Sequence, residues 1–117
     1  MRRPAQPRDI PPPLELECLK VLWKLDEGTV HAVRHGLQES RALAYTTVLT
    51  LLDRLEKRDL VIRRKQGRAF VYAPKASREI MRERALKELT GNFFDGSEEE
   101  LLAYLQMRAQ KSAGASG

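Results

Sequence analysis

The feature that most constrains this chain of 117 residues is the stretch at positions 44–58, AYTTVLTLLDRLEKR. Its apolar side chains recur at i, i+3, i+4 and i+7, which predicts an amphipathic helix with one face in a core. These apolar residues are Val48, Leu51, Leu52 and Leu55. The opposite face carries hydroxyl groups and then positive charges. Two interpretations fit: an ordinary surface helix, or the second helix of a helix-turn-helix unit, which lies in the DNA major groove.

The polar face of this helix has the chemistry that DNA recognition requires. Short hydroxyl side chains can approach base edges or phosphates closely, and Arg and Lys supply phosphate contacts. The candidate DNA-binding residues of the helix are Thr46, Thr47, Thr50, Arg54 and Lys57. The formal net charge of the chain is +5, and residues 44–76 alone contain eight basic and three acidic residues. This concentration of charge favours a surface that faces phosphates.

The residues around this helix predict a winged helix-turn-helix at positions 14–76. Helices are expected at 14–25 and at 30–37, the second capped by Thr29. After position 59 the pattern alternates, which predicts a hairpin with strands at 60–65 and 68–72 and a turn at Gln66-Gly67. Four basic residues surround the turn and are expected to contact phosphates, although an exposed charged turn is the alternative. They are Arg63, Arg64, Lys65 and Arg68.

The C-terminal part of the chain predicts a helical dimerisation element at positions 77–107. One helix is expected at 77–90, ended by Gly91, and a capping box at Ser97–Glu100 opens another. Two such helices cannot bury their apolar faces alone, which suggests a homodimer. The candidate dimerisation residues are Ile80, Met81, Leu86, Leu89, Phe93, Phe94, Leu101, Leu102 and Leu105. Flexible segments are expected at 1–13 and 108–117. The predicted fold class is mainly α with a small β-hairpin.

Several function classes lack support in the sequence. The single cysteine, Cys18, excludes an intramolecular disulfide and suits a buried position in a reducing compartment. His31 and His35 are four residues apart, but no third ligand follows at metal spacing, so a solvated pair is favoured over a zinc site. No glycine-rich phosphate loop or catalytic constellation is present, so we expect no enzyme activity and no cofactor. No signal peptide or membrane-spanning stretch is found, and a cytoplasmic location with no membrane insertion is expected.

A family resemblance is carried by five segments in order along the chain. They are LELECLKVLW, TVHAVRHGL, LAYTTVLTLLDRLEKRDLV, GRAFVYAP and NFFDGSEEELLAYL. Together they resemble the BlaI/MecI/CopY family of penicillinase-repressor transcriptional regulators. The resemblance implies a winged-helix domain and a dimerisation domain. It also implies a homodimer that binds a palindromic operator in double-stranded DNA and represses β-lactamase, copper-efflux or related genes. Thr47, Thr50 and Arg54 correspond to the reading positions of the family, and Arg68 to its wing.

The resemblance also bears on how such a repressor is released. In the β-lactam branch, a membrane sensor triggers proteolysis at an Asn-Phe pair, which resembles Asn92-Phe93 here. Phe93 is equally well explained as a core residue. The copper-responsive branch has clustered cysteines near the C-terminus, and this chain lacks them. The dimerisation element of this chain is expected to be shorter than that of β-lactam regulators. A winged-helix protein-interaction module without sequence-specific DNA binding is the alternative function.

Overall fold

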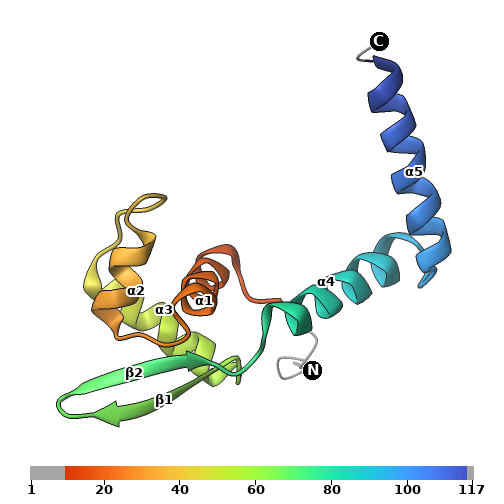
Figure 1. Ribbon diagram of the computed structural model, residues 1–117. Coiled ribbons are helices and arrows are strands. Elements are labelled where there is room, and N and C mark those ends of the chain that lie inside the picture. The colour runs from red at the N-terminus through yellow and green to blue at the C-terminus, as the bar shows by residue number, and fades with distance from the viewer. Residues whose placement is uncertain (1–9, 116–117) are drawn as a thin grey trace.

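The computed structural model describes residues 10–115 and shows a helical unit with a hairpin, from which two further helices extend (Figure 1). The elements in order are α1 Pro13–Leu25, α2 Val30–Leu37, α3 Tyr45–Lys57, β1 Val61–Gln66, β2 Ala69–Pro74, α4 Arg78–Phe93 and α5 Glu98–Ala115. The hairpin lies along one side of the three-helix cluster formed by α1, α2 and α3. The predicted fold class, mainly α with a small β-hairpin, is confirmed.

The apolar face of α3 closes the core of the three-helix cluster. Val48, Leu52 and Leu55 are fully buried and pack with apolar side chains of α1 and α2. α1 and α2 approach closely because Gly36 of α2 has no side chain. A Cβ at Gly36 would lie 2.6 Å from a methyl carbon of Val21 in α1. The helical periodicity of the sequence therefore identified the buried face correctly.

Local backbone chemistry sets the ends of these helices. The Thr29 hydroxyl accepts a hydrogen bond from the Ala32 N–H, which is the predicted cap of α2. Asp26 and Asp59 adopt the left-handed backbone region, with φ of 73° and 65°, and reverse the chain after α1 and α3. Aspartate tolerates this region better than most non-glycine residues, which explains its use at both breaks.

The hairpin turn is one residue later than the sequence suggested. The strands pair antiparallel from Val61 opposite Pro74 to Gln66 opposite Ala69, so the two turn residues are Gly67 and Arg68. Gly67 has a φ of 64°, the conformation that favours glycine in tight hairpins.

An isolated β-bridge holds the hairpin to the connection between α1 and α2. The N–H of Gly28, in the connection between α1 and α2, donates to the carbonyl of Tyr72, and the Tyr72 N–H donates back at 2.8 Å. Tyr72 is 1% exposed, so its ring joins the core beneath this bridge. The hairpin, α2 and α3 therefore form one packed body.

The attachment of α4 to this body is built around Trp23. The indole N–H of Trp23 donates to the carbonyl of Ala76 at 2.8 Å, just before α4 begins. The Arg78 guanidinium lies 5.2 Å from the centre of the same ring. Met81 is only 5% exposed and packs against the core of the helical unit. Its predicted place on a dimerisation face is therefore wrong, because the first turn of α4 leans on α1.

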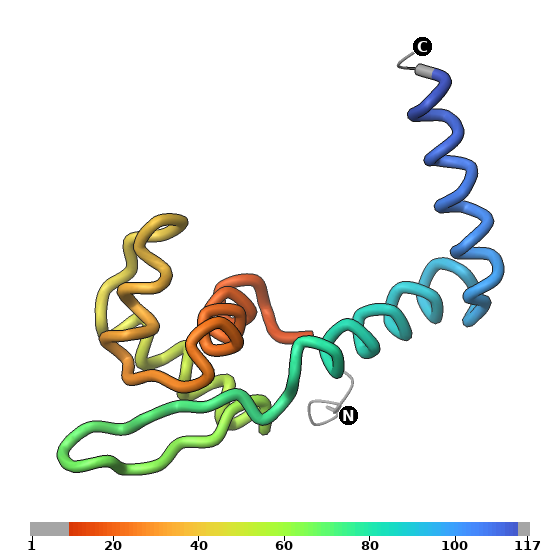
Figure 2. The backbone as a smooth tube through the Cα atoms, viewed as in Figure 1, coloured from red at the N-terminus to blue at the C-terminus, as the bar shows by residue number. Residues whose placement is uncertain are grey.

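The corner between α4 and α5 differs from the prediction. Gly91 does not end α4, which continues to Phe93. The chain turns instead at Asp95 and Gly96, whose φ values are 50° and 80°. Figure 2 shows the sharp change of direction that this turn produces in the backbone.

Serine caps open both of these helices, as the sequence predicted for α5. The Ser77 hydroxyl accepts from the Ile80 N–H, and the Ser97 hydroxyl accepts from the Glu100 N–H. The second half of the predicted capping box is replaced, since the Ser97 N–H donates to the carbonyl of Phe94.

The two predicted flexible ends are only partly described by the structure. The predicted tail at 108–117 is wrong as far as Ala115, because α5 continues to that residue. Extending a helix costs little once its first turns have formed, which allows Lys111 and Ser112 to continue it. At the other end, Pro11 is buried against the fold, and positions 1–9 and 116–117 lie outside the described residues.

Candidate nucleic-acid interface

The predicted reading face of α3 is fully available. Its five candidate residues are all exposed: Thr46, Thr47, Thr50, Arg54 and Lys57. The Thr50 hydroxyl donates to the backbone carbonyl of Thr46 at 3.0 Å, which orients its lone pairs outward as acceptors. An acceptor held in this way can receive a hydrogen bond from a base amino group.

An acidic residue, Asp53, lies on this face and was not singled out from the sequence. A carboxylate oxygen of Asp53 lies 3.1 Å from Lys57 Nζ, and the two side chains form an ion pair. The pair occupies positions i and i+4, a spacing at which side chains on a helix meet. Asp53 therefore reduces the free positive charge of Lys57, and a carboxylate at a reading face can itself accept from cytosine N4.

The four basic residues of the hairpin are exposed but fall into two classes. Arg64 donates two hydrogen bonds to Glu27, at 3.0 and 2.8 Å, and one to Gln66 at 3.0 Å. The hydrogen bond from Arg64 holds the pKa of Glu27 below its ordinary value, and the carboxylate in turn raises the pKa of Arg64. Arg64 is thus paired within the molecule, and its phosphate contact stays a prediction.

Arg63 is also partly engaged. Its Nε lies 3.6 Å from a carboxylate oxygen of Glu56, and its guanidinium lies 4.3 Å from the centre of the Phe70 ring. Burial raises the pKa of the nearby Tyr72, and a hydrogen bond with Arg63 opposes this rise. Arg63 consequently supports the hairpin where it meets α3.

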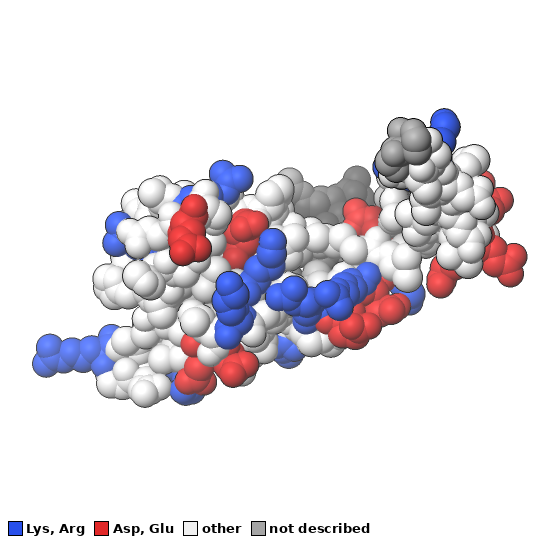
Figure 3. All heavy atoms as spheres, turned by 45° about the horizontal axis from the view of Figure 1, so that its top comes forward, with Lys and Arg blue, Asp and Glu red and all other residues white. Residues whose placement is uncertain are grey.

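Lys65 and Arg68 form the second class. Within residues 10–115 neither has a carboxylate partner. Figure 3 shows a basic side chain projecting at the end of the molecule opposite the acidic groups near α5. These two cations are available to an external anion.

A cavity of about 150 Å³ separates α3 from the hairpin, and the sequence did not indicate it. The rings of His31 and Tyr45 lie at its edge with their centres 4.7 Å apart. Arg68 lines the same cavity. His31 was interpreted from the sequence as one of two solvated histidines, because its neighbour Tyr45 is distant along the chain and comes close only after α2 packs on α3.

The remaining candidate residues lie on α4 and α5. Five of the predicted dimerisation residues are exposed: Ile80, Leu89, Phe93, Leu102 and Leu105. Leu86 and Phe94 are half-buried, and Leu101 is 7% exposed. The rings of Phe94 and Tyr104 lie 5.6 Å apart and close the corner between the helices. Among residues 10–115, no element covers this apolar surface of the α4–α5 arm.

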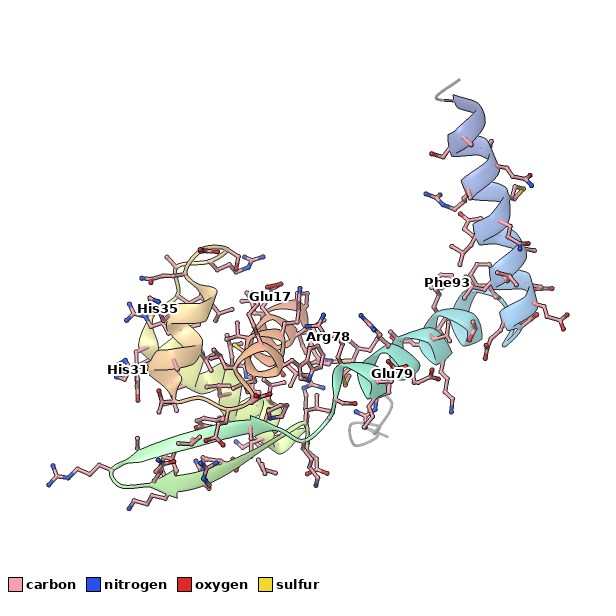
Figure 4. All side chains as sticks on the ribbon, in the orientation of Figure 1. Glu17, His31, His35, Arg78, Glu79 and Phe93 are labelled. Carbon is pink, nitrogen blue, oxygen red and sulfur yellow. The ribbon has the colours of Figure 1, made fainter. Side chains whose placement is uncertain are left out.

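The candidate cleavage pair lies at the end of this arm's first helix. Asn92 and Phe93 form the last two residues of α4, and Phe93 is 75% exposed (Figure 4). Phe93 is therefore not a core residue within the chain. Among the described residues, no helix combines the length and apolar character needed to cross a membrane.

Comparison with known proteins decides the family. The sequence pattern of the penicillinase repressor family matches residues 12–114. The chain belongs to this family. The transcriptional regulator BlaI of Mycobacterium tuberculosis is 43% identical over 67 residues, which cover 56% of this chain and 49% of that protein. The chain thus spans about half the length of this relative.

Two further comparisons agree. The penicillinase repressor of Bacillus licheniformis is 30% identical over 83 residues, covering 71% of this chain and 65% of that protein. A solution structure of the monomeric form of Bacillus licheniformis BlaI in complex with the blaP half-operator superposes with a TM-score of 0.52. It is 30% identical and covers 62% of this chain and 88% of that one. The winged-helix fold and the family predicted from the sequence are both confirmed.

Proposed function

We propose that this chain is a transcriptional repressor that binds a palindromic operator as a homodimer. The observation that carries the proposal is the exposed hydroxyl and basic face of α3 beside two uncompensated hairpin cations, Lys65 and Arg68. Family membership supports the same function, since two relatives are named as a transcriptional regulator and a penicillinase repressor. A cytoplasmic location is part of the proposal, because the protein must reach its operator DNA.

Different residues carry affinity and specificity in this proposal. Thr46, Thr47 and Thr50 face the base edges in the major groove, while Arg54 and Lys57 contact the flanking phosphates. The hairpin lies on the neighbouring backbone through Lys65 and Arg68. Arg63 and Arg64 contribute mainly by holding the hairpin in place, because both contact carboxylates of the same domain.

The homodimer is proposed from the apolar surface of α4 and α5. Leu102 and Leu105 are 56% and 51% exposed on neighbouring turns of α5, and Phe93 adds a ring close to the corner. Exposed apolar surface of this kind gains stability when a second copy covers it. Two subunits joined in this way would read half-sites one helical turn of DNA apart, or a multiple of that distance.

Release of the repressor by proteolysis at Asn92-Phe93 is part of the proposal. The last turn of a helix opens more readily than its middle, and the exposed Phe93 side chain offers a protease a recognisable group. A cut there would separate the α5 surface from the DNA-binding unit. A membrane sensor or a protease under its control is the proposed partner.

The proposed function is tested by a salt titration of binding to the protein's own promoter region, with random DNA alongside. Thr50→Ala is expected to lower the ratio of operator to random-DNA affinity by roughly three- to thirtyfold, because it removes a base-reading hydroxyl. Arg68→Ala is expected to weaken both DNAs similarly and to reduce the salt slope by about one unit.

The outcome of the same titration distinguishes the alternative. Equal loss on both DNAs for Thr50→Ala would remove that residue from base reading. Weak binding to every duplex, without salt dependence, would contradict the repressor and favour a protein-interaction module.

A further inference from the structure

The cavity between α3 and the hairpin is lined by both polar and apolar side chains. It measures about 150 Å³ and is formed by the start of α2, one flank of α3 and the returning strand β2. Its lining residues are Thr29, Val30, His31, Tyr45, Leu49, Arg68, Ala69, Phe70 and Tyr72. No aspartate or glutamate is among them. Five of the lining side chains can donate hydrogen bonds, Arg68 among them as a cation, and the other four are apolar.

The groups that face His31 come from three elements. The ring of Tyr45 in α3 lies tilted with its centre 4.7 Å from that of His31, Tyr72 belongs to β2, and Arg68 belongs to the hairpin turn. On its own helix the charged neighbours are Arg34 and the second histidine, His35, and the Arg34 guanidinium donates to the carbonyl of Leu43. A proton on His31 thus finds no carboxylate around the cavity to balance it.

The position of the cavity relates it to DNA. Tyr45 and Leu49 line it from the flank of α3, next to the exposed face that carries Thr46 and Thr50. Arg68 lines it from the hairpin. If α3 lies in the major groove and the hairpin on the backbone, as proposed, the DNA strand between them would pass over the hollow. That strand carries one phosphate per nucleotide, each with oxygen acceptors for a hydrogen bond.

We propose that this cavity is a DNA phosphate site in which His31 is a backbone contact that strengthens on protonation. The inference rests on the proposed function and adds a residue to it. Protonated imidazole donates through both ring nitrogens, so a phosphate in the hollow accepts from His31 and Arg68 together. Histidine side chains gain this charge between about pH 8 and pH 5. Affinity for DNA consequently rises as the pH falls.

The chain contains its own control for this effect. His31 and His35 lie one turn apart on α2, and both are exposed. Figure 4 shows His31 at the end of α2 nearer the hairpin and His35 nearer the other end. Only His31 lines the cavity. Replacing His31 removes an imidazole inside the proposed site, whereas replacing His35 removes an imidazole of the same helix outside it.

The experiment measures binding of the full chain to a fluorescently labelled duplex of random sequence at pH 6 and pH 8. His31→Gln is expected to weaken binding roughly three- to tenfold at pH 6 and less than about twofold at pH 8. It should also reduce the salt slope at pH 6 by about one unit. His35→Gln is expected to match the wild type at both pH values, and thermal unfolding confirms that each variant folds.

A second measurement follows the two imidazoles directly by nuclear magnetic resonance, assigned from the two variants. Adding DNA at pH 6 should move the resonances of the His31 ring more than those of the His35 ring, because only His31 lines the cavity. Equal pH dependence in His31→Gln and the wild type, or equal losses in both variants, would overturn the phosphate site while leaving DNA binding intact. Failure of the wild type to bind any duplex would instead reject the proposed function.

Discussion

The helical unit with its hairpin and the α4–α5 arm use similar apolar residues in opposite ways. In the first, Leu19, Leu22 and Leu52 are fully buried, and the helices satisfy one another's apolar faces. In the second, Phe93 is 75% exposed and Met107 58% exposed. The first region closes its own core, whereas the second presents a surface that a further copy can complete. We therefore expect stability to reside in the first region and the proposed assembly in the second.

The largest expected effect comes from placing charge on the arm. Leu102→Glu together with Leu105→Glu should convert the dimer to a monomer, because two carboxylates would be buried unpaired in the interface. Affinity for the operator should then fall by roughly 10²–10⁴-fold, the usual gain from linking two binding units. Light scattering gives the mass, and DNA titration gives the affinity.

Leu25→Glu is the matched control for that experiment. Leu25 is 42% exposed, comparable to the arm leucines, but it lies at the end of α1 in the self-contained unit. Its mass and affinity should stay unchanged. A dimer that survives both arm substitutions would place the interface elsewhere.

The core of the helical unit should respond differently. Leu52→Ala removes a fully buried side chain and should lower the free energy of unfolding by about 2–5 kcal/mol. Urea unfolding measures the loss at several protein concentrations. The loss should be independent of protein concentration, whereas the loss from Leu105→Ala should depend on it if α5 forms the proposed dimer interface. If the losses from Leu52→Ala and Leu105→Ala depended on protein concentration in the same way, the proposed difference between the two regions would be wrong.

A smaller effect is expected at the ion pair that ties α1 to the end of α3. Glu15 is 2% exposed and accepts from Arg58 Nε at 2.9 Å. Glu15→Gln should cost about 1–3 kcal/mol, because a charged donor keeps only a neutral, weaker acceptor. Thermal unfolding measures it. Glu17→Gln is the control, with an exposed partner, Lys20, at 3.4 Å, and should change stability by less than about 0.5 kcal/mol.

The smallest effect concerns the exposed pair between the hairpin and the connection before α2. The hydrogen bond from Arg64 lowers the pKa of Glu27 from 4.5, so the pair's contribution is present above that pH and is lost as the pH falls through the lowered pKa. Amide hydrogen exchange at Gly28 and Tyr72 should become faster over this acid range. Glu27→Gln should exchange faster already at neutral pH and lose the acid dependence. Unchanged exchange in the variant would show that the backbone bridge alone holds the hairpin.

The sequence predicted best what depends on near neighbours along the chain. The buried face of α3 follows from helical spacing, and the caps at Thr29 and Ser97 follow from residue type at one position. The end of α5 was missed because the pattern near Ser112 contains no apolar face, although a helix already formed continues through it.

Contacts between residues far apart in the sequence could not be predicted from local sequence patterns. Arg64 and Glu27 are 37 positions apart, and many other carboxylates could have paired with the hairpin. The apolar spacing of α4 does not show whether Met81 packs against the helical unit or against a second copy. Only the packing of the helices decides that Met81 is buried within the chain. The cavity at His31 likewise exists only once three elements meet.

The indole that anchors α4 has a consequence for observing this protein at work. Trp23 is the only tryptophan among the 117 residues, and it lies at the junction where the arm meets the helical unit. Its fluorescence therefore comes from a single place, with the Ala76 carbonyl and the Arg78 guanidinium as neighbours. Any event that pivots α4, whether operator binding or cleavage of the arm, changes the surroundings of the ring. The chain thus carries an intrinsic fluorophore where α4 joins the helical unit, and its emission can be measured without a label.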